Sequence, residues 1–166
     1  MSKTEQNLWA AFAGESQANR KYLAFAKQAE KEGHKRVAKL FRAAAEAETV
    51  HAHAHLGVLG GIKSTAENLK EAIAGETHEF KKMYPEMIEA AKAEGNKNAD
   101  RSFSYANAVE KVHANLYQKA LDSLGKGKED DVTYWVCYVC GYTCENEPPE
   151  KCPVCGAAKK IFCKVD

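Results

Sequence analysis

The chain has 166 residues, 45% of them apolar, and its 24 basic and 23 acidic side chains leave a formal net charge of +1. This length suffices for one or two small domains with a core, and the balanced charge gives no basic patch that would grip nucleic acid. The first residues lack a signal-peptide pattern, and no apolar run approaches the ~20 residues of a membrane helix. We therefore expect a protein of the cytoplasm with neither a nucleic-acid nor a membrane partner.

Residues 1–124 have the composition of helices throughout, since they are rich in Ala, Glu and Lys and contain a single proline. Glycine-containing breaks, each a plausible helix end, divide this part into four long segments. The predicted helices span residues 4–31, 35–59, 65–93 and 97–124. The pattern predicts a mainly α protein built on a four-helix bundle.

A carboxylate interrupts the apolar stripe near the middle of each predicted helix, and on two helices a histidine follows it by three residues. In chain order these residues are Glu15, Glu48 with His51, Glu76 with Glu79 one turn later, and Glu110 with His113. Any one of them alone could be a surface residue. Buried together, however, the carboxylates would repel one another unless cations lay among them. Glutamate and neutral histidine suit iron or manganese, and we expect two divalent irons to supply the positive charge.

The spacing of these carboxylates supports one shared site. From Glu15 to Glu48 is 33 residues and from Glu76 to Glu110 is 34, each with one helix reversal about halfway. This repeat matches the ligands of carboxylate-bridged two-metal bundles, which use one Glu from each of two helices and Glu-x-x-His from each of the others. We expect Glu48 and Glu110 to bridge the two metals. Glu15 and Glu76 should be terminal ligands, each bound to one metal. Glu79 is either a solvated residue or a fifth carboxylate ligand.

The last part of the chain differs in composition. Residues 125–131, GKGKEDD, predict a linker, and residues 132–166 form a module with β-prone stretches at 132–139 and 160–165. Such a module is too small to rest on an apolar core and needs a covalent or metal staple.

All six cysteines lie in this module. Cys137 and Cys140 form one CxxC pair, Cys152 and Cys155 form another, and eleven residues separate the pairs. Four thiolates in this arrangement predict a tetrahedral sulfur site for iron or zinc. The remaining two, Cys144 and Cys163, are interpreted as small half-buried thiols rather than further ligands.

Nearly the whole chain resembles the rubrerythrins. The motifs that carry the resemblance are GESQA at 14–18 leading to Tyr22, ETVH at 48–51, GETHE at 75–79 leading to MYP at 83–85, EKVH at 110–113, and WVCYVCGY with KCPVCG in the cysteine module. The resemblance implies a ferritin-like di-iron bundle followed by a rubredoxin-like, β-rich domain. It also implies that the second and third helices run parallel across a crossover, although the residue counts fit a simple up-down bundle equally well.

The same resemblance implies roles for three further side chains. Glu79 would bind one iron in the oxidised state and, with the carboxylates around it, is a candidate proton donor. Tyr22 and Tyr84 match tyrosines that hydrogen-bond the ligand carboxylates. Rubrerythrins commonly form dimers, in which the cysteine domain of one subunit serves the di-iron site of the other.

These features predict a peroxidase that reduces hydrogen peroxide to water in defence against oxidative stress. An iron pair can hold two electrons, and a four-thiolate iron passes one electron at a time without an open position for substrate. Electrons would come from NAD(P)H through a separate reductase, or from a rubredoxin, because the chain has no dinucleotide-binding fingerprint. The alternatives are a ferroxidase that uses oxygen, and a structural protein with zinc, which can replace iron, in the cysteine site.

Overall fold

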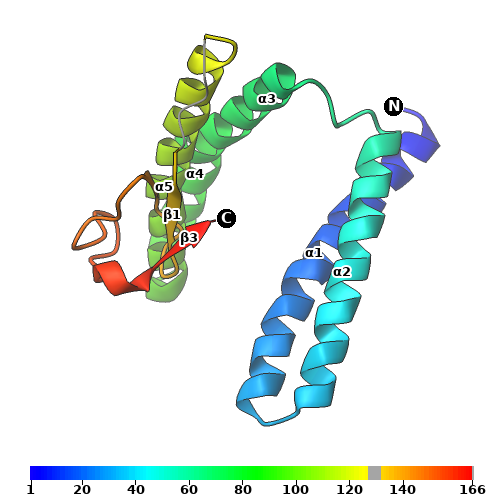
Figure 1. Ribbon diagram of the computed structural model, residues 1–166, viewed down its shortest axis with the longest axis horizontal. Helices are drawn as coiled ribbons and strands as arrows, with labels where there is room; N and C mark the ends of the chain where they lie inside the picture. The colour runs from blue at the N-terminus through cyan, green and yellow to red at the C-terminus, as the bar shows by residue number, and fades with distance from the viewer. Residues whose placement is uncertain (127–131, 166) are drawn as a thin grey trace. The chain divides into compact units, whose positions relative to one another are not determined.

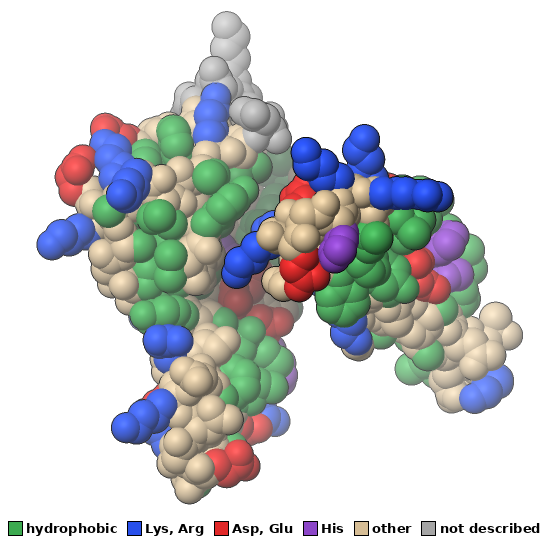
Figure 2. All heavy atoms as spheres, turned by 90° about the horizontal axis from the view of Figure 1, so that it is seen from below, with side chains coloured by type: hydrophobic (Ala, Val, Ile, Leu, Met, Phe, Trp, Pro, Cys, Tyr) green, Lys and Arg blue, Asp and Glu red, His purple; other side chains and the backbone are tan. Residues whose placement is uncertain are grey.

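The computed structural model describes residues 1–126 and 132–165. It divides into two compact units, Met1–Lys63 and Ser64–Asp166 (Figure 1). Long helices and one small sheet confirm the predicted mainly α fold class. Residues 127–131, most of the predicted linker, lie outside the described residues, so the domain boundaries stay a prediction. On the face seen in Figure 2, acidic and basic side chains are interspersed.

The first unit is a hairpin of two helices, α1 (Lys3–Lys31) and α2 (Lys35–Val58). Ser2 and Glu5 form a capping box that begins α1, since each side chain accepts from the other's backbone N–H. Small side chains let the two helices approach closely, and the buried ones are Ala26, Ala29, Ala38, Ala45 and Ala52. The close packing holds the interior stripes of α1 and α2 beside each other.

The buried polar side chain Asn19 fixes the register of this hairpin. Its Nδ2 donates to the Ala45 carbonyl at 2.8 Å and to the Thr49 hydroxyl at 2.9 Å. These bonds join the middle of α1 to the middle of α2, at the height of the interior glutamates.

The helices of the second unit are α3 (Thr65–His78), α4 (Tyr84–Ala93) and α5 (Lys97–Ser123). A π-helical turn, η1 (Glu79–Met83), joins α3 to α4, where the sequence predicted one α-helix over 65–93. In this turn the Tyr84 N–H donates to the Glu79 carbonyl, five residues earlier. Pro85 has no N–H for the carbonyl four residues before it, so the turn ahead of it is free to widen. The other predicted helix ends agree with the structure to within one residue.

The cysteine module has a three-stranded antiparallel sheet in the order β2-β1-β3. Its strands are β1 (Tyr134–Cys137), β2 (Thr143–Glu145) and β3 (Phe162–Val165), with a short 3-10 turn, η2 (Lys159–Ile161), before β3. Strands β1 and β3 fall in the predicted stretches, whereas β2 was not predicted. The buried core of the module is Cys137, Cys152 and Phe162, so its interior is built largely around sulfur.

Candidate metal centres

The first unit brings together Glu15 of α1 with Glu48 and His51 of α2, whose ligand atoms all lie within 4.8 Å of one another. Nδ1 of His51 lies 3.1 Å from a carboxylate oxygen of Glu48. A hydrogen bond between the two carboxyl groups raises the pKa of Glu15 and lowers that of Glu48. The His51 side chain is 56% exposed, so this group lies at the surface of its unit.

The second unit repeats the arrangement with Glu76 of α3 and Glu110 and His113 of α5, again within 4.8 Å. Nδ1 of His113 lies 2.8 Å from a Glu110 oxygen and 3.8 Å from a Glu76 oxygen. Burial, followed by the hydrogen bond to Glu110, raises the pKa of Glu76 to about 7. The His113 side chain is 27% exposed, about half the value of its counterpart.

Glu79, the first residue of the π-helical turn, lies close to the second group. Burial and then the charge of Glu110 raise its pKa. Tyr84, at the other end of the turn, is half-buried, and burial followed by the charges of Glu79 and Glu110 raises its pKa. The turn therefore brings both side chains within electrostatic reach of the second group, while their roles stay a prediction.

Tyr22 packs against the rings of Phe25 and Phe41, with centroid distances of 6.4 and 6.0 Å. Its predicted role at the carboxylates stays a prediction. Tyr117 was not singled out by the sequence analysis, but burial and then the charges of Glu76 and Glu110 raise its pKa. Its position one turn after His113 on the same helix face was the signal that could have found it.

The chemistry of these donors fits iron. In each group one carboxyl takes a raised pKa, through the hydrogen bond to Glu48 at Glu15 and through burial at Glu76, and the neighbouring carboxylate charge adds to the shift in both. A divalent ion bound to carboxylate oxygens and imidazole nitrogen would replace the shared proton.

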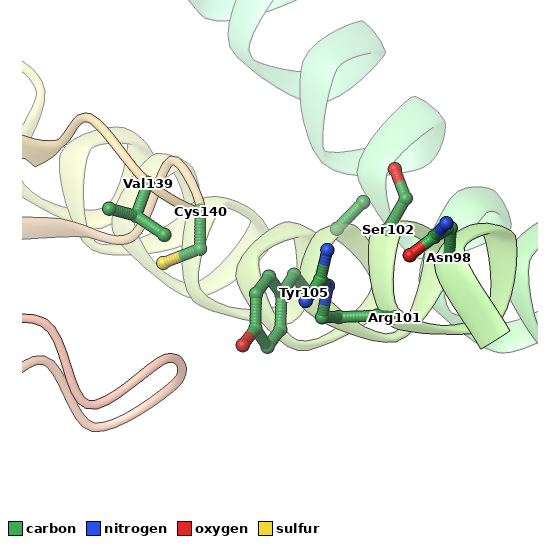
Figure 3. Close-up of a pocket in the computed structure, with 7 residues that line it drawn as sticks. Asn98, Arg101, Ser102, Tyr105, Val139 and Cys140 are labelled. Atoms are coloured by element: carbon green, nitrogen blue, oxygen red, sulfur yellow. The ribbon is translucent and has the colours of Figure 1, made fainter.

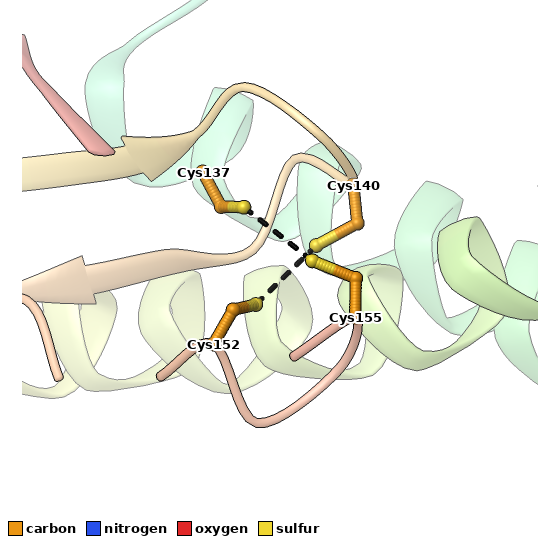
Figure 4. Close-up of side chains that lie close together, drawn as sticks. All are labelled: Cys137, Cys140, Cys152 and Cys155. Atoms are coloured by element: carbon orange, nitrogen blue, oxygen red, sulfur yellow. Dashed lines mark hydrogen bonds between the residues drawn. The ribbon is translucent and has the colours of Figure 1, made fainter. Parts of the chain in front are cut away.

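The four predicted cysteine ligands form one cluster (Figure 4). The Sγ atoms of Cys137 and Cys155 lie 3.7 Å apart, and those of Cys140 and Cys152 lie 3.5 Å apart. A tetrahedral site with metal–sulfur bonds of about 2.3 Å has sulfur–sulfur edges of about 3.8 Å. The cluster therefore has the dimensions of a four-thiolate iron or zinc site.

The two CxxC-Gly segments of this cluster have the same backbone hydrogen bond and the same glycine conformation. The N–H of Gly141 donates to the Cys137 carbonyl at 2.8 Å, and the N–H of Gly156 donates to the Cys152 carbonyl at 2.9 Å. These glycines have φ of +85° and +75°, a conformation that side chains disfavour. Each CxxC-Gly segment is therefore a tight knuckle that directs two sulfurs to one point.

The two remaining cysteines lie outside the cluster. Cys144 pairs with Trp135 across β1 and β2, and its thiol approaches the Glu147 carbonyl at 3.9 Å. Cys163 is half-buried on β3 opposite Val136. Both agree with the interpretation as half-buried thiols.

A cavity of about 570 Å³ lies beside one edge of the thiol cluster (Figure 3). Arg101, Ser102 and Tyr105 of α5 line it opposite Val139 and Cys140 of the first knuckle. One member of the cluster, Cys140, therefore borders this cavity. Within the described residues no helix is long and apolar enough to cross a membrane.

Helices with paired Glu-Glu-His groups and an appended four-cysteine domain define the class of ferritin-like, carboxylate-ligand metalloproteins with a rubredoxin-like module. A family profile described as Rubrerythrin matches residues 6–121, and one described as Rubrerythrin, rubredoxin-like domain, matches residues 135–163. The chain belongs to the rubrerythrin family.

Named relatives match over almost the full length of this chain. Rubrerythrin-2 of Clostridium acetobutylicum is 37% identical, with 96% of this chain and 95% of the relative covered. Nigerythrin of Nitratidesulfovibrio vulgaris is 35% identical, with 98% and 86% covered. The solved structure of fully reduced, all-ferrous nigerythrin matches with a TM-score of 0.60 at 35% identity, covering 99% of this chain and 88% of that one.

The expected cofactors agree with these findings. The Glu-Glu-His groups correspond to the di-iron site of the family, and the four cysteines correspond to the rubredoxin-like iron site. The assignment of individual residues as ligands belongs to the proposal below.

Proposed function

We propose that this protein is a peroxidase that reduces hydrogen peroxide to water. The reaction takes H₂O₂, two electrons and two protons and yields two molecules of water. The observation that carries the proposal is the presence, in one chain, of two Glu-Glu-His groups and a separate four-thiol cluster. An iron pair supplies two-electron redox chemistry with open positions for a small substrate.

In this proposal the di-iron ligands are Glu15, Glu48, His51, Glu76, Glu79, Glu110 and His113. The carboxylates balance the positive charge of the metals, and the imidazoles hold a neutral nitrogen lone pair toward them. Glu79 also supplies protons, a role that its pKa, raised by burial and then by the charge of Glu110, supports. Tyr22 and Tyr84 orient the carboxylates.

The four cysteines hold a third iron, which accepts electrons one at a time. The donor is a separate NAD(P)H-linked reductase or a rubredoxin. The cavity beside Cys140 supports this role, because it borders one member of the cluster. Membership of the family supports a homodimer as the working unit, and the six unpaired thiols support a reducing compartment such as the cytoplasm.

The proposal is tested by reoxidation of the iron-loaded protein after anaerobic reduction. One equivalent of H₂O₂, or separately of O₂, is added, and the red absorbance of the ferric four-thiolate iron is followed in time. We expect the colour to return rapidly with peroxide and slowly with oxygen. The test variant is Glu79→Gln, which leaves the thiol cluster unchanged. The return of the red colour after peroxide should be at least ~100-fold slower in this variant.

The alternatives give different outcomes in the same experiment. A faster response to oxygen than to peroxide would identify a ferroxidase. A fully iron-loaded protein without red colour at any stage would contradict the assignment of the four-thiolate iron and favour a structural zinc module.

A further inference from the structure

The two histidines of the Glu-Glu-His groups differ in what their second ring nitrogen meets. Nε2 of His113 lies 2.9 Å from the hydroxyl of Thr143, which belongs to the cysteine module. His51 is mostly exposed, and its Nδ1 contacts Glu48 of its own helix. The cysteine module therefore contacts the second Glu-Glu-His group through the hydrogen bond between Thr143 and His113.

The direction of this hydrogen bond depends on which ring nitrogen of His113 carries the proton. A threonine hydroxyl has one proton to donate, and Thr143 has the Gly141 carbonyl 3.1 Å away as an acceptor. When the hydroxyl donates there, its oxygen accepts the Nε2–H of His113. A neutral imidazole protonated at Nε2 has its lone pair on Nδ1, the nitrogen that faces Glu110 and Glu76.

Strand β2 is anchored so that Thr143 faces α5. Alternate residues of a strand point the same way, and Gly141, Thr143 and Glu145 are spaced by two. A side chain at Gly141 would lie against Val109 of α5 at 3.8 Å, and Glu145 forms an ion pair with Lys119 of α5. The contact with His113 therefore lies between two others along the same helix.

The surroundings of the bond are mostly apolar. Nine residues line a cavity of about 390 Å³ at this place, among them His113 and Thr143 with Leu69, Leu116 and Val136. A hydrogen bond in such surroundings has few competing water partners, which strengthens its hold on the ring.

We propose that Thr143 is a positioning residue that holds His113 as the Nε2–H tautomer, with Nδ1 free for a metal at Glu76 and Glu110. The hydroxyl of Thr143 donates to the carbonyl of Gly141, and Gly141 directly follows the cluster residue Cys140. The geometry of the thiol knuckle thereby sets the orientation of a ligand to the other metal site. This inference rests on the metal role of His113 in the proposed function.

The test uses the full chain loaded with Zn²⁺, which is diamagnetic, and ¹⁵N NMR of the histidine rings, with His113→Gln to assign the signal. We expect the ring proton of His113 on Nε2 and protected from exchange with water. In Thr143→Val the protection should fall by about tenfold or more, and the zinc affinity of the site by about tenfold. Thr143→Ser should restore both, and Thr133→Val, a matched change in the same module, should alter neither.

The outcomes separate the two proposals. If zinc leaves the ring nitrogens of His113 unchanged in the wild-type protein, the metal role of His113 fails, and this inference fails with it. If zinc binds Nδ1 but Thr143→Val keeps the protection and the affinity, only the role of Thr143 is overturned. Should Thr143→Val not fold, as judged by the absorption of its cobalt-loaded thiol cluster, a ring proton on Nδ1 in the wild-type zinc protein would overturn the inference by itself.

Discussion

Burial, and then the hydrogen bond to Glu110, raises the pKa of Glu76 to about 7, far above the 4.5 of an ordinary glutamate. Between these two pH values the folded chain without metal holds a proton that the unfolded chain has lost. Folding therefore becomes less favourable as the pH rises through this window, because the folded state binds more protons there.

We expect the free energy of unfolding of the metal-free protein to receive its full contribution from Glu76 below pH 4.5 and to lose it as the pH rises to about 7. Glu76→Gln keeps the hydrogen bond without the charge, so its stability should decline less over this range. Urea unfolding at several pH values measures the difference. If the free energy of unfolding changed with pH in the same way in both proteins, Glu76 would not be the source of the pH dependence.

Among single residues, the sequence analysis singled out the glutamates and histidines that repeat on the helices. It missed residues such as Thr143 that lie outside any repeat. Glu15, Glu48 and His51 come from local spacing on a helix face, which a sequence displays directly. Thr143 meets His113 from 30 residues further along the chain, through a strand too short to have a pattern of its own. Such a contact depends on tertiary packing, which local periodicity does not encode.

The close packing of α1 on α2 positions the first Glu-Glu-His group, and the π-helical turn between α3 and α4 brings Glu79 and Tyr84 close to the second. Helix bounds were predicted well because glycines mark most of the ends. The π turn was not predicted, because one extra residue in a turn leaves the composition unchanged and shifts the apolar pattern only beyond it.

Replacement of Asn19 by alanine should reduce the free energy of unfolding by about 1–3 kcal/mol. The change removes both hydrogen bonds from the buried amide to α2 and leaves the helix propensity of α1 intact. Chemical denaturation measures the loss. Asn7→Ala, on an exposed position of the same helix, is the control and should stay within about 0.5 kcal/mol of the wild type.

Deletion of Lys82 should convert the π turn into an ordinary α-helical one. The segments on its two sides then rotate by about 100° relative to each other, so α3 and α4 can no longer both keep their faces on α5. We expect unchanged helical circular dichroism and a loss of about 2 kcal/mol or more in stability. Lys82→Ala keeps the chain length and should resemble the wild type, while equal stability of the deletion would exclude a packing role for the turn.

On the scale of the whole molecule, the helices and the cysteine module are stabilised in different ways. The helices bury small apolar side chains along their length, whereas the core of the module is two cysteines and one phenylalanine. We therefore expect the module to depend on a metal bound by its cysteines for folding. The sequence predicted this division because all six cysteines lie in the last 30 residues.

Cys137→Ser should abolish the red four-thiolate colour and unfold the module without melting the helices. Cys137 is fully buried, so its loss removes a ligand and opens the centre of the core. Absorbance reports the iron, and far-ultraviolet circular dichroism reports the helices. Cys163→Ser, a half-buried thiol outside the cluster, is the matched control and should keep the colour.

The two tryptophans of the chain are divided between the two units. Trp9 lies on α1 beside Phe12, whereas Trp135 packs against the thiol core, and its indole donates to the Asn146 carbonyl. A ferric ion in that core would absorb the light that Trp135 emits, and iron held at Glu15, six residues from Trp9 on α1, would act on Trp9 in the same way. In a Trp9→Phe variant, emission gained on standing therefore counts the molecules that have lost the iron of the cysteine module, and no added dye is required.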